Sequence, residues 1–233
     1  MRRHVEVLAI AALLSAFPVS AAAAEGAAGP SRSRASWLMS GATVGAGHNA
    51  LQAQLGWPGL DFTFLHGASP TLDLGASLGF NYGFEGIPKY RAMPGLRLNG
   101  VVRLELVEED KLNIGVRVSP GFFVYFDEVY NYWHRTEIEA RFGFSLPVEL
   151  VAGFLVLPNL TVHAGIAMPI GFQLTESFVF LMPMLPGFGA EYRVNDALSL
   201  TFDSRFGPNI VIGEDNADVD FAFRMLVGAG YRF

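Results

Sequence analysis

The chain of 233 residues contains no cysteine, and its only lysines are Lys89 and Lys111. Without cysteine it can form no disulfide framework, no zinc–thiolate site and no cysteine nucleophile. Charged residues make up 16% of the chain and the formal net charge is −6, so nucleic acid is not an expected partner. The shortage of lysine also disfavours a soluble β-sandwich, whose outer face would carry many lysines.

Long apolar runs are scarce too, and the clearest one lies at the N-terminus. A basic start precedes a mostly apolar run over residues 7–17, and small residues follow up to Ala24. This order predicts a secretory signal peptide over residues 1–24, and then a flexible leader over residues 25–34. A membrane anchor is the alternative, but the run is shorter than the roughly 20 residues that a spanning helix needs.

Apolar residues fall on every second position over most of the remaining chain. A period of two predicts β-strands with one apolar and one polar face. There are about ten such runs, an even number that suits a closed antiparallel up-and-down transmembrane β-barrel over residues 35–233, with 8 or 12 strands as alternatives. The runs cover residues 37–44, 51–64, 72–84, 96–106, 112–126, 140–156, 160–172, 178–194, 198–206 and 221–233.

Nearly every charge within these runs lies on the polar phase, whereas the apolar phase is almost free of charge. This distribution favours lipid outside and a polar lumen inside. Aromatic residues of the apolar phase gather near the strand ends, as in the interfacial girdles of membrane barrels. The predicted lumen charges are Arg97, Arg103, Arg117, Glu149, Asp203, Arg205 and Arg224.

Basic and acidic residues nearly balance on the polar phase, which favours ion pairs that fill the lumen over a field that selects ions of one sign. Many inward glycines leave space, however, so a filled lumen and a narrow passive pore both stay open. Helical spans are a further alternative for residues 146–172. That stretch keeps its period of two and is interrupted by Pro158, which argues against a helix.

Short turns alternate with longer, more polar loops along the chain. The turns at residues 69–70, 108–110, 158–159 and 195–196 are expected on the periplasmic side, together with both termini, because the strand number is even. The loops expected on the outer side are residues 85–91, 127–136, 175–177 and 213–218.

Prolines recur inside the predicted strands, although each removes a hydrogen-bond donor from the ladder. The alternation keeps its phase across most of them but slips around Trp57 and Pro58, which predicts a bulge there. We predict that the prolines mark bulges that bend a narrow wall. They are Pro58, Pro94, Pro120, Pro147, Pro169, Pro183, Pro186 and Pro208.

The final run ends on Phe233, with Tyr231, Ala229 and Val227 at alternate positions before it. This pattern resembles the C-terminal signal of bacterial outer-membrane β-barrel proteins. The resemblance implies insertion by the barrel-assembly machinery and a location among outer-membrane lipids. It covers one strand and identifies no narrower family or oligomeric state.

Residues suited to catalysis are present but are not arranged as in known enzymes. Asp127, Glu128 and His134 share a predicted outer loop but do not reproduce the spacing of the omptin proteases. His163 is expected to face the lumen without the serine partner that a lipid A deacylase needs. A hydrolase of either type is the alternative to a non-enzymatic role.

The predicted outer loops contain the remaining candidates. The histidines are scattered, so no metal site or cofactor is predicted. Four acidic residues could hold calcium but are more simply solvated; they are Glu214, Asp215, Asp218 and Asp220. Aromatic residues of the third loop are candidates for contact with a partner or with lipid headgroups. They are Tyr130, Tyr132 and Trp133. The predicted function is a structural or interaction role, or a narrow pore for small solutes.

Overall fold

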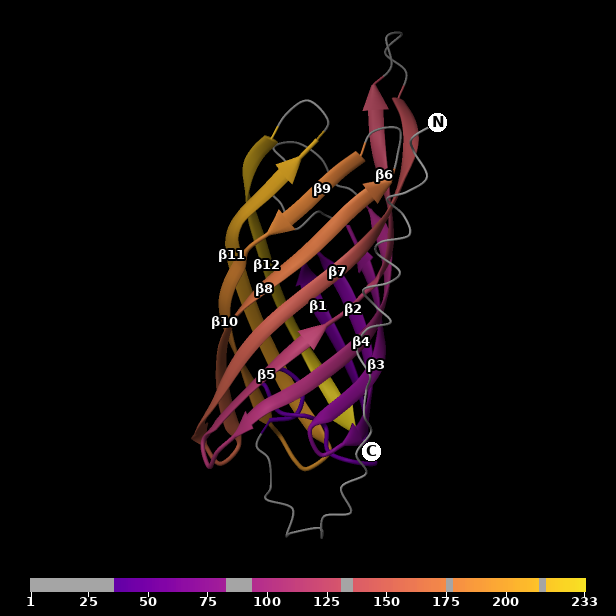
Figure 1. The fold of residues 1–233 in the computed structure, drawn as a ribbon. Coiled ribbons are helices and arrows are strands. Elements are labelled where there is room, and N and C mark those ends of the chain that lie inside the picture. Colours follow the sequence, from indigo (N-terminus) through magenta and orange to yellow (C-terminus); the bar gives the residue numbers. More distant parts are fainter. Residues whose placement is uncertain (1–35, 83–93, 131–135, 175–177, 214–216) are drawn as a thin grey trace, which may run out of the picture. The chain divides into compact units, whose positions relative to one another are not determined.

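The computed structural model describes residues 36–82, 94–130, 136–174, 178–213 and 217–233, which form a closed antiparallel β-barrel (Figure 1). Twelve strand segments make one sheet, and the last strand pairs with the first. Closure therefore pairs the two strands that would otherwise be sheet edges. Within these described ranges, no helix is long and apolar enough to cross a membrane.

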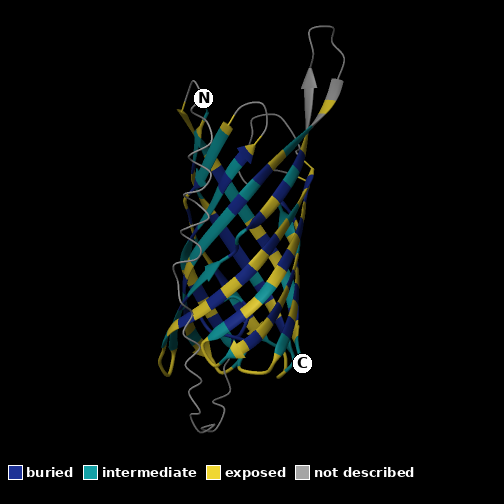
Figure 2. Ribbon diagram, turned by 45° about the vertical axis from the view of Figure 1, so that its right-hand side comes forward, coloured by how far each residue is buried: buried dark blue, intermediate teal, exposed yellow. Residues whose placement is uncertain are grey.

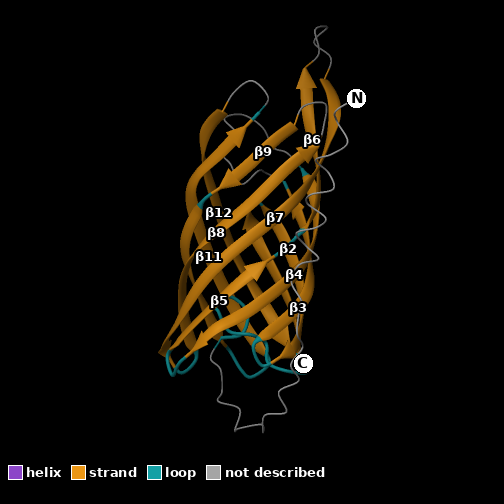
Figure 3. Cartoon of the chain, in the orientation of Figure 1, coloured by secondary structure: helices purple, strands orange, loops and turns teal. Residues whose placement is uncertain are grey.

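Adjacent strands are antiparallel and follow the chain order around the wall. The strands are β1 (Asn49–Trp57), β2 (Gly59–Ser69), β3 (Leu72–Asn81), β4 (Gly95–Glu108), β5 (Leu112–Val118), β6 (Gly121–Tyr130), β7 (Thr136–Leu157), β8 (Leu160–Leu174), β9 (Phe178–Pro183), β10 (Leu185–Arg193), β11 (Leu198–Ile212) and β12 (Ala217–Arg232). One end of the barrel carries the C-terminus and the short connections that follow β2, β4, β7 and β10, and it is here called the turn end (Figure 3). The opposite end is called the loop end.

The twelve described segments occupy ten positions in the wall. β5 and β6 both pair with β4 on one side and with β7 on the other, so they are two halves of one strand interrupted at Ser119 and Pro120. β9 and β10 likewise both lie between β8 and β11, with the interruption at Met184. The predicted all-β barrel of about ten strands is confirmed.

The predicted single strand over residues 51–64 is wrong, because the chain reverses within it. β1 ends at Trp57 and β2 begins at Gly59, so Pro58 lies at the tip of a hairpin. Proline has no N–H and suits a turn better than a ladder. Leu55 pairs with Leu60 across this turn, and both side chains are exposed on the outer face. The hairpin, rather than a bulge, explains the slip in phase.

The predicted strand over residues 37–44 is also wrong. These residues form bends inside the barrel, where Trp37 and Val44 are 0% exposed. The wall begins only at Asn49, whose N–H donates to the Phe233 carbonyl oxygen at 2.8 Å. One predicted strand is therefore lost here and one is gained at Pro58, so the two errors cancel in the strand number.

The wall is apolar outside and polar inside, and the exposure of its residues alternates along each strand (Figure 2). Outward Leu98 and Phe122 are 60% and 68% exposed, whereas inward Asp203 and Arg205 are 0% exposed. A water-soluble fold places its apolar surface in a core. This barrel does the reverse, which suits an apolar medium around the wall.

The prolines do not mark bulges, contrary to the prediction. Pairing runs without a shift through Pro147, Pro169, Pro186 and Pro208. The register shifts among the described strands lie near the turn end and involve no proline. They fall at Gly67/Ser69, Glu105/Val107 and Leu155/Leu157.

The prolines instead form a row across neighbouring strands from β5 to β11. Pro147 lies directly opposite Pro169, and the registers on either side place Pro183 opposite Pro169 as well. A proline can accept a ladder hydrogen bond but cannot donate one. Accordingly, Ser119 N–H donates to the Pro147 oxygen and Met184 N–H to the Pro208 oxygen, each at 2.8 Å. The missing donors are thus concentrated in one band of the wall.

Candidate functional site

Residues 36–44, here called the plug, fill the lumen at the turn end. The plug backbone rests directly on the wall, since a Cβ added at Gly41 would lie 2.3 Å from the Gly115 nitrogen. Only glycine allows so close an approach of two backbones. The plug also supplies half of an apolar cluster inside the barrel. That cluster comprises Trp37, Leu38, Val44, Ala50, Leu65 and Val101.

The carboxylate of Glu191 anchors the start of the plug. Glu191 lies on β10 and is 0% exposed. It accepts hydrogen bonds from Ser36 Oγ at 2.6 Å and from the backbone N–H groups of Trp37, Leu38 and Met39 at 3.1, 3.0 and 3.0 Å. Successive backbone N–H groups form a concave anion site. The plug therefore wraps around a charge that the wall presents.

Asp73 on β3 and Arg103 on β4 hold the rest of the plug. Val44 N–H donates to both carboxylate oxygens of Asp73, at 3.2 and 3.1 Å. Arg103 donates to the carbonyl oxygen of Trp37 at 3.2 Å and to that of Ala42, and its Nε lies 3.7 Å from Asp73. Side chains of the wall thus bind mainly the backbone of the plug. Bonds of this kind leave no pattern in the amino-acid sequence of the plug.

A network of charged side chains crosses the middle of the lumen. Asp203 on β11 pairs with Arg205 Nε at 3.1 Å, Arg224 Nη2 at 3.1 Å and His163 Nε2 at 3.3 Å. Arg205 also pairs with Glu149 of β7. Buried charges need such partners because leaving one unpaired is strongly destabilising. The network links β7, β8, β11 and β12 across the interior.

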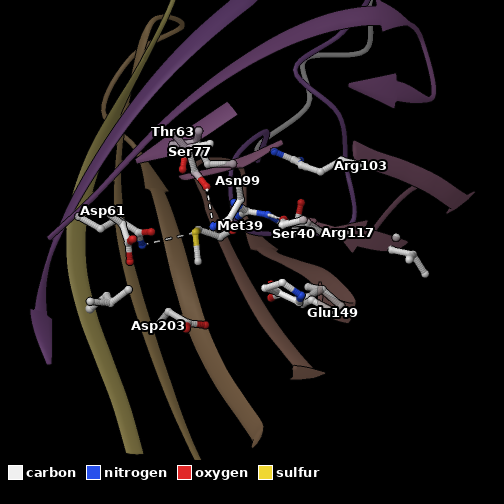
Figure 4. Close-up of a pocket in the computed structure, with 18 of the residues that line it drawn as sticks. Met39, Ser40, Asp61, Thr63, Ser77, Asn99, Arg103, Arg117, Glu149 and Asp203 are labelled. Atoms are coloured by element: carbon white, nitrogen blue, oxygen red, sulfur yellow. Dashed lines mark hydrogen bonds between the residues drawn. The ribbon is translucent and has the colours of Figure 1, made fainter. Parts of the chain in front are cut away.

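A polar cavity of about 100 Å³ lies in the lumen, bounded by the plug and by the charged network (Figure 4). Met39 and Ser40 line it from the plug, and Arg117, Asn99 and Asp203 are among the wall residues that line it. A water molecule occupies roughly 30 Å³ in the liquid. The cavity therefore has room for about three water molecules.

A smaller cavity of about 50 Å³ is lined by Phe123, Tyr125 and the inward prolines of β7 and β8. The two aromatic rings lie 5.2 Å apart, and Asn81 Nδ2 donates to the Tyr125 hydroxyl at 3.0 Å. Phe123 and Tyr125 stand on the polar phase and face inward, which the sequence interpretation missed. They narrow the lumen on the side of the network away from the plug.

The predicted lumen charges all face the interior but have different partners. Arg103 contacts the plug, Arg97 pairs with Asp61 at 3.0 Å, and Arg117 faces the cavity. The other predicted charges form the central network: Glu149, Asp203, Arg205 and Arg224. The predicted lumen charges do not include Glu191 and Asp73, because the partners of these two carboxylates belong to residues 37–44, which were predicted to be a strand of the wall.

The residues of the terminal pattern lie on the outer face of β12. Val227, Tyr231 and Phe233 are 46%, 53% and 55% exposed, and Ala229 is partly buried between them. Tyr132, Trp133 and His134 lie outside the described residues, and so do the side chain of Tyr130 and the acidic residues Glu214 and Asp215. The described part of the chain contains no group of three His, Asp or Glu side chains placed to hold a metal.

No protein-family model matches this chain, and no curated protein matches it. Solved structures that resemble it are distant in sequence. The outer membrane protease OmpT of Escherichia coli has a TM-score of 0.49 at 8% identity, with 80% of this chain and 96% of OmpT covered. The N-terminal β-barrel domain of Pseudomonas aeruginosa OprF has a TM-score of 0.42 at 8% identity, with 81% and 99% covered. The β domain of the Bordetella autotransporter BrkA has a TM-score of 0.39 at 12% identity, with 80% and 97% covered.

Proposed function

We propose that this chain is a non-enzymatic protein of the bacterial outer membrane, whose barrel is closed at rest and serves a structural or interaction role. The observation that carries the closed state is the plug. Glu191, Asp73 and Arg103 bind it through its backbone, and a cavity of about 100 Å³ lies between it and the charged network. An open diffusion pore would need a continuous aqueous path instead.

The outer-membrane location is supported by the wall. Its outward face is apolar, and a ladder of outward aromatic rings crosses β6 to β9 towards the loop end. Phe144 contacts Phe122 at 5.7 Å and Phe172 at 6.5 Å, and Phe172 contacts Phe180 at 5.2 Å. Such a band is typical of the membrane interface. The proposal places the turn end, with both termini, in the periplasm.

A non-enzymatic role is supported by the surroundings of the one described histidine in the lumen. His163 is 3% exposed and pairs with Asp203, which itself pairs with two arginines. A peptide or a lipid could not reach this imidazole without displacing the network. A general base must come within hydrogen-bond reach of its substrate. The pair is therefore assigned to the packing of the lumen.

Planar bilayers provide the test of the closed state. The purified mature protein should produce no steady ohmic conductance, even at high protein load and in 1 M salt. A known porin added afterwards to the same bilayer shows that the assay detects open barrels. Steady conductance from the unmodified protein would overturn the closed state and favour the narrow pore, which is the second function that the polar lumen can support.

A further inference from the structure

Arg117 differs from the other arginines of the cavity in its partners. Its Nε donates to Ser119 Oγ at 3.2 Å, and its side chain lines the cavity of about 100 Å³. Among the described residues, no carboxylate lies within ion-pair distance of it. Each carboxylate that lines the cavity already pairs with another arginine. These pairs are Asp61 with Arg97, Glu149 with Arg205, and Asp203 with Arg205 and Arg224.

The charges that line the cavity do not balance. Its guanidinium groups belong to Arg97, Arg103, Arg117 and Arg224, and its carboxylates belong to Asp61, Glu149 and Asp203. One positive charge is therefore in excess. In the described part of the chain, Arg117 is the cavity arginine without an ion pair, because Glu149, which lies directly opposite it on β7, pairs with Arg205. A charge held away from bulk water is costly unless a partner compensates it.

We propose that this cavity binds one small monovalent anion, such as a halide or nitrate, at the guanidinium of Arg117. The volume fits such an ion with one or two water molecules, and it is too small for a lipid phosphate with its glycerol. A single excess charge favours a monovalent ion, because a divalent anion would be repelled by the nearby carboxylates. Neutral donors of the lining complete the site. They are the hydroxyls of Ser40, Thr63, Ser77 and Ser119 and the amide of Asn99.

The site joins the plug to the wall. Met39, Ser40 and Gly41 belong to the plug, whereas Arg117 and Gly115 belong to β5, and all five line the same cavity. An anion held there would contact both parts only while the plug is seated. A ligand that binds only this state stabilises it by mass action. The anion is therefore expected to strengthen the closed form of the barrel.

The first experiment measures thermal unfolding of the purified protein during a titration with bromide, with gluconate keeping the ionic strength constant. The midpoint should rise and then saturate. Arg117→Gln should weaken the apparent affinity by at least about tenfold, the effect of losing one charge-assisted hydrogen bond. Arg193→Gln, which changes an arginine outside the cavity, should behave like the unmodified protein. The proposal would be overturned if the unfolding midpoint did not change with bromide concentration, or if it rose equally in the unmodified protein and in Arg117→Gln.

Diffraction with bromide gives a test that does not depend on a variant that folds. Crystals grown in bromide should show an anomalous peak inside the cavity, within hydrogen-bond distance of the Arg117 guanidinium. A cavity that holds water alone in those crystals would contradict the site. The bilayer assay measures conductance, whereas the bromide experiments measure anion binding. A negative bromide result therefore does not contradict the closed state of the barrel, and steady conductance does not by itself contradict the anion site.

Discussion

Buried carboxylates have different partners in two regions of the lumen. At the turn end, Glu191 and Asp73 accept hydrogen bonds from backbone N–H groups of the plug. In the middle, Asp203 and Glu149 pair with guanidinium groups of the wall. The central network is thus formed by wall residues alone, whereas the carboxylates of the turn end depend on a segment that crosses the interior.

This difference indicates which part of the barrel can change state. Removing the plug would leave Glu191 without the donors it has in the closed barrel, while Asp203 would keep its arginines. Removing the partner of a buried charge costs about 3–5 kcal/mol. The stability of the turn end is therefore coupled to the position of the plug, and the stability of the middle is not.

Deletion of residues 36–44 should have the largest effect on stability. It removes the plug's hydrogen-bond donors to two buried carboxylates, and it also removes half of the apolar cluster. We expect the free energy of unfolding to fall by more than about 5 kcal/mol. Denaturant titration of the refolded protein measures this loss. A loss below about 1 kcal/mol would show that the wall satisfies Glu191 and Asp73 without the plug.

Asp203→Ala should have the next largest effect and should act only on the middle of the lumen. Arg205 and Arg224 would lose their shared carboxylate, at a cost of about 3–5 kcal/mol. The matched control is Asp196→Ala, which changes an exposed residue of a turn and should stay within about 0.5 kcal/mol. Equal effects of the two substitutions in denaturant titration would contradict the role of the network.

Glu191→Gln should loosen the plug while leaving the central network intact. The amide keeps an acceptor but loses the charge, which should cost about 1–3 kcal/mol. Because the chain has no cysteine, Ser40→Cys adds a single thiol in the plug. Labelling of that thiol by a bulky maleimide should be slow alone and faster in combination with Glu191→Gln. The control is Glu109→Gln, which changes an exposed residue of a turn. Equal labelling rates for Ser40→Cys alone, with Glu191→Gln and with Glu109→Gln would contradict the role of Glu191 in holding the plug.

Gly41→Ala should give the smallest loss that is still measurable. Its Cβ would lie 2.3 Å from the Gly115 nitrogen, and neither backbone can yield without shifting the plug. Overpacking of this kind costs about 1–3 kcal/mol. Gly100→Ala is the matched control, since the nearest atom to its new Cβ lies 3.8 Å away. Equal midpoints for the two variants in denaturant would show that the plug does not rest on β5.

The alternating pattern of the chain predicts the barrel and the inward direction of its charges well. The alternation of apolar and polar residues along one strand is enough to predict whether a side chain faces the lumen or the outside. Arg205 can thus be placed inside and Leu98 outside without knowledge of distant partners. The slip at Pro58 was visible too, but one slip in phase is compatible with either a bulge or a hairpin. The choice depends on whether Leu55 and Leu60 pair, which is a contact across a turn.

The plug could not be predicted in this way. Residues 37–44 carry a weak alternation, and nothing nearby distinguishes a strand from a segment inside the lumen. The distinction depends on Glu191, which lies 155 positions from Ser36 in the chain and accepts hydrogen bonds from the plug backbone. Such bonds are made by every residue type except proline, so the plug side chains carry little trace of them.

The amino-acid pattern therefore settles the architecture of the wall, because a period of two is a local property that each strand expresses independently. The contents of the lumen follow from the folded barrel alone. Closure of the sheet brings β3, β4 and β10 around the plug, and it leaves Arg117 facing a cavity while its neighbours are paired. Which buried charges find partners is decided by distances across the lumen, and these distances exist only after the sheet has closed.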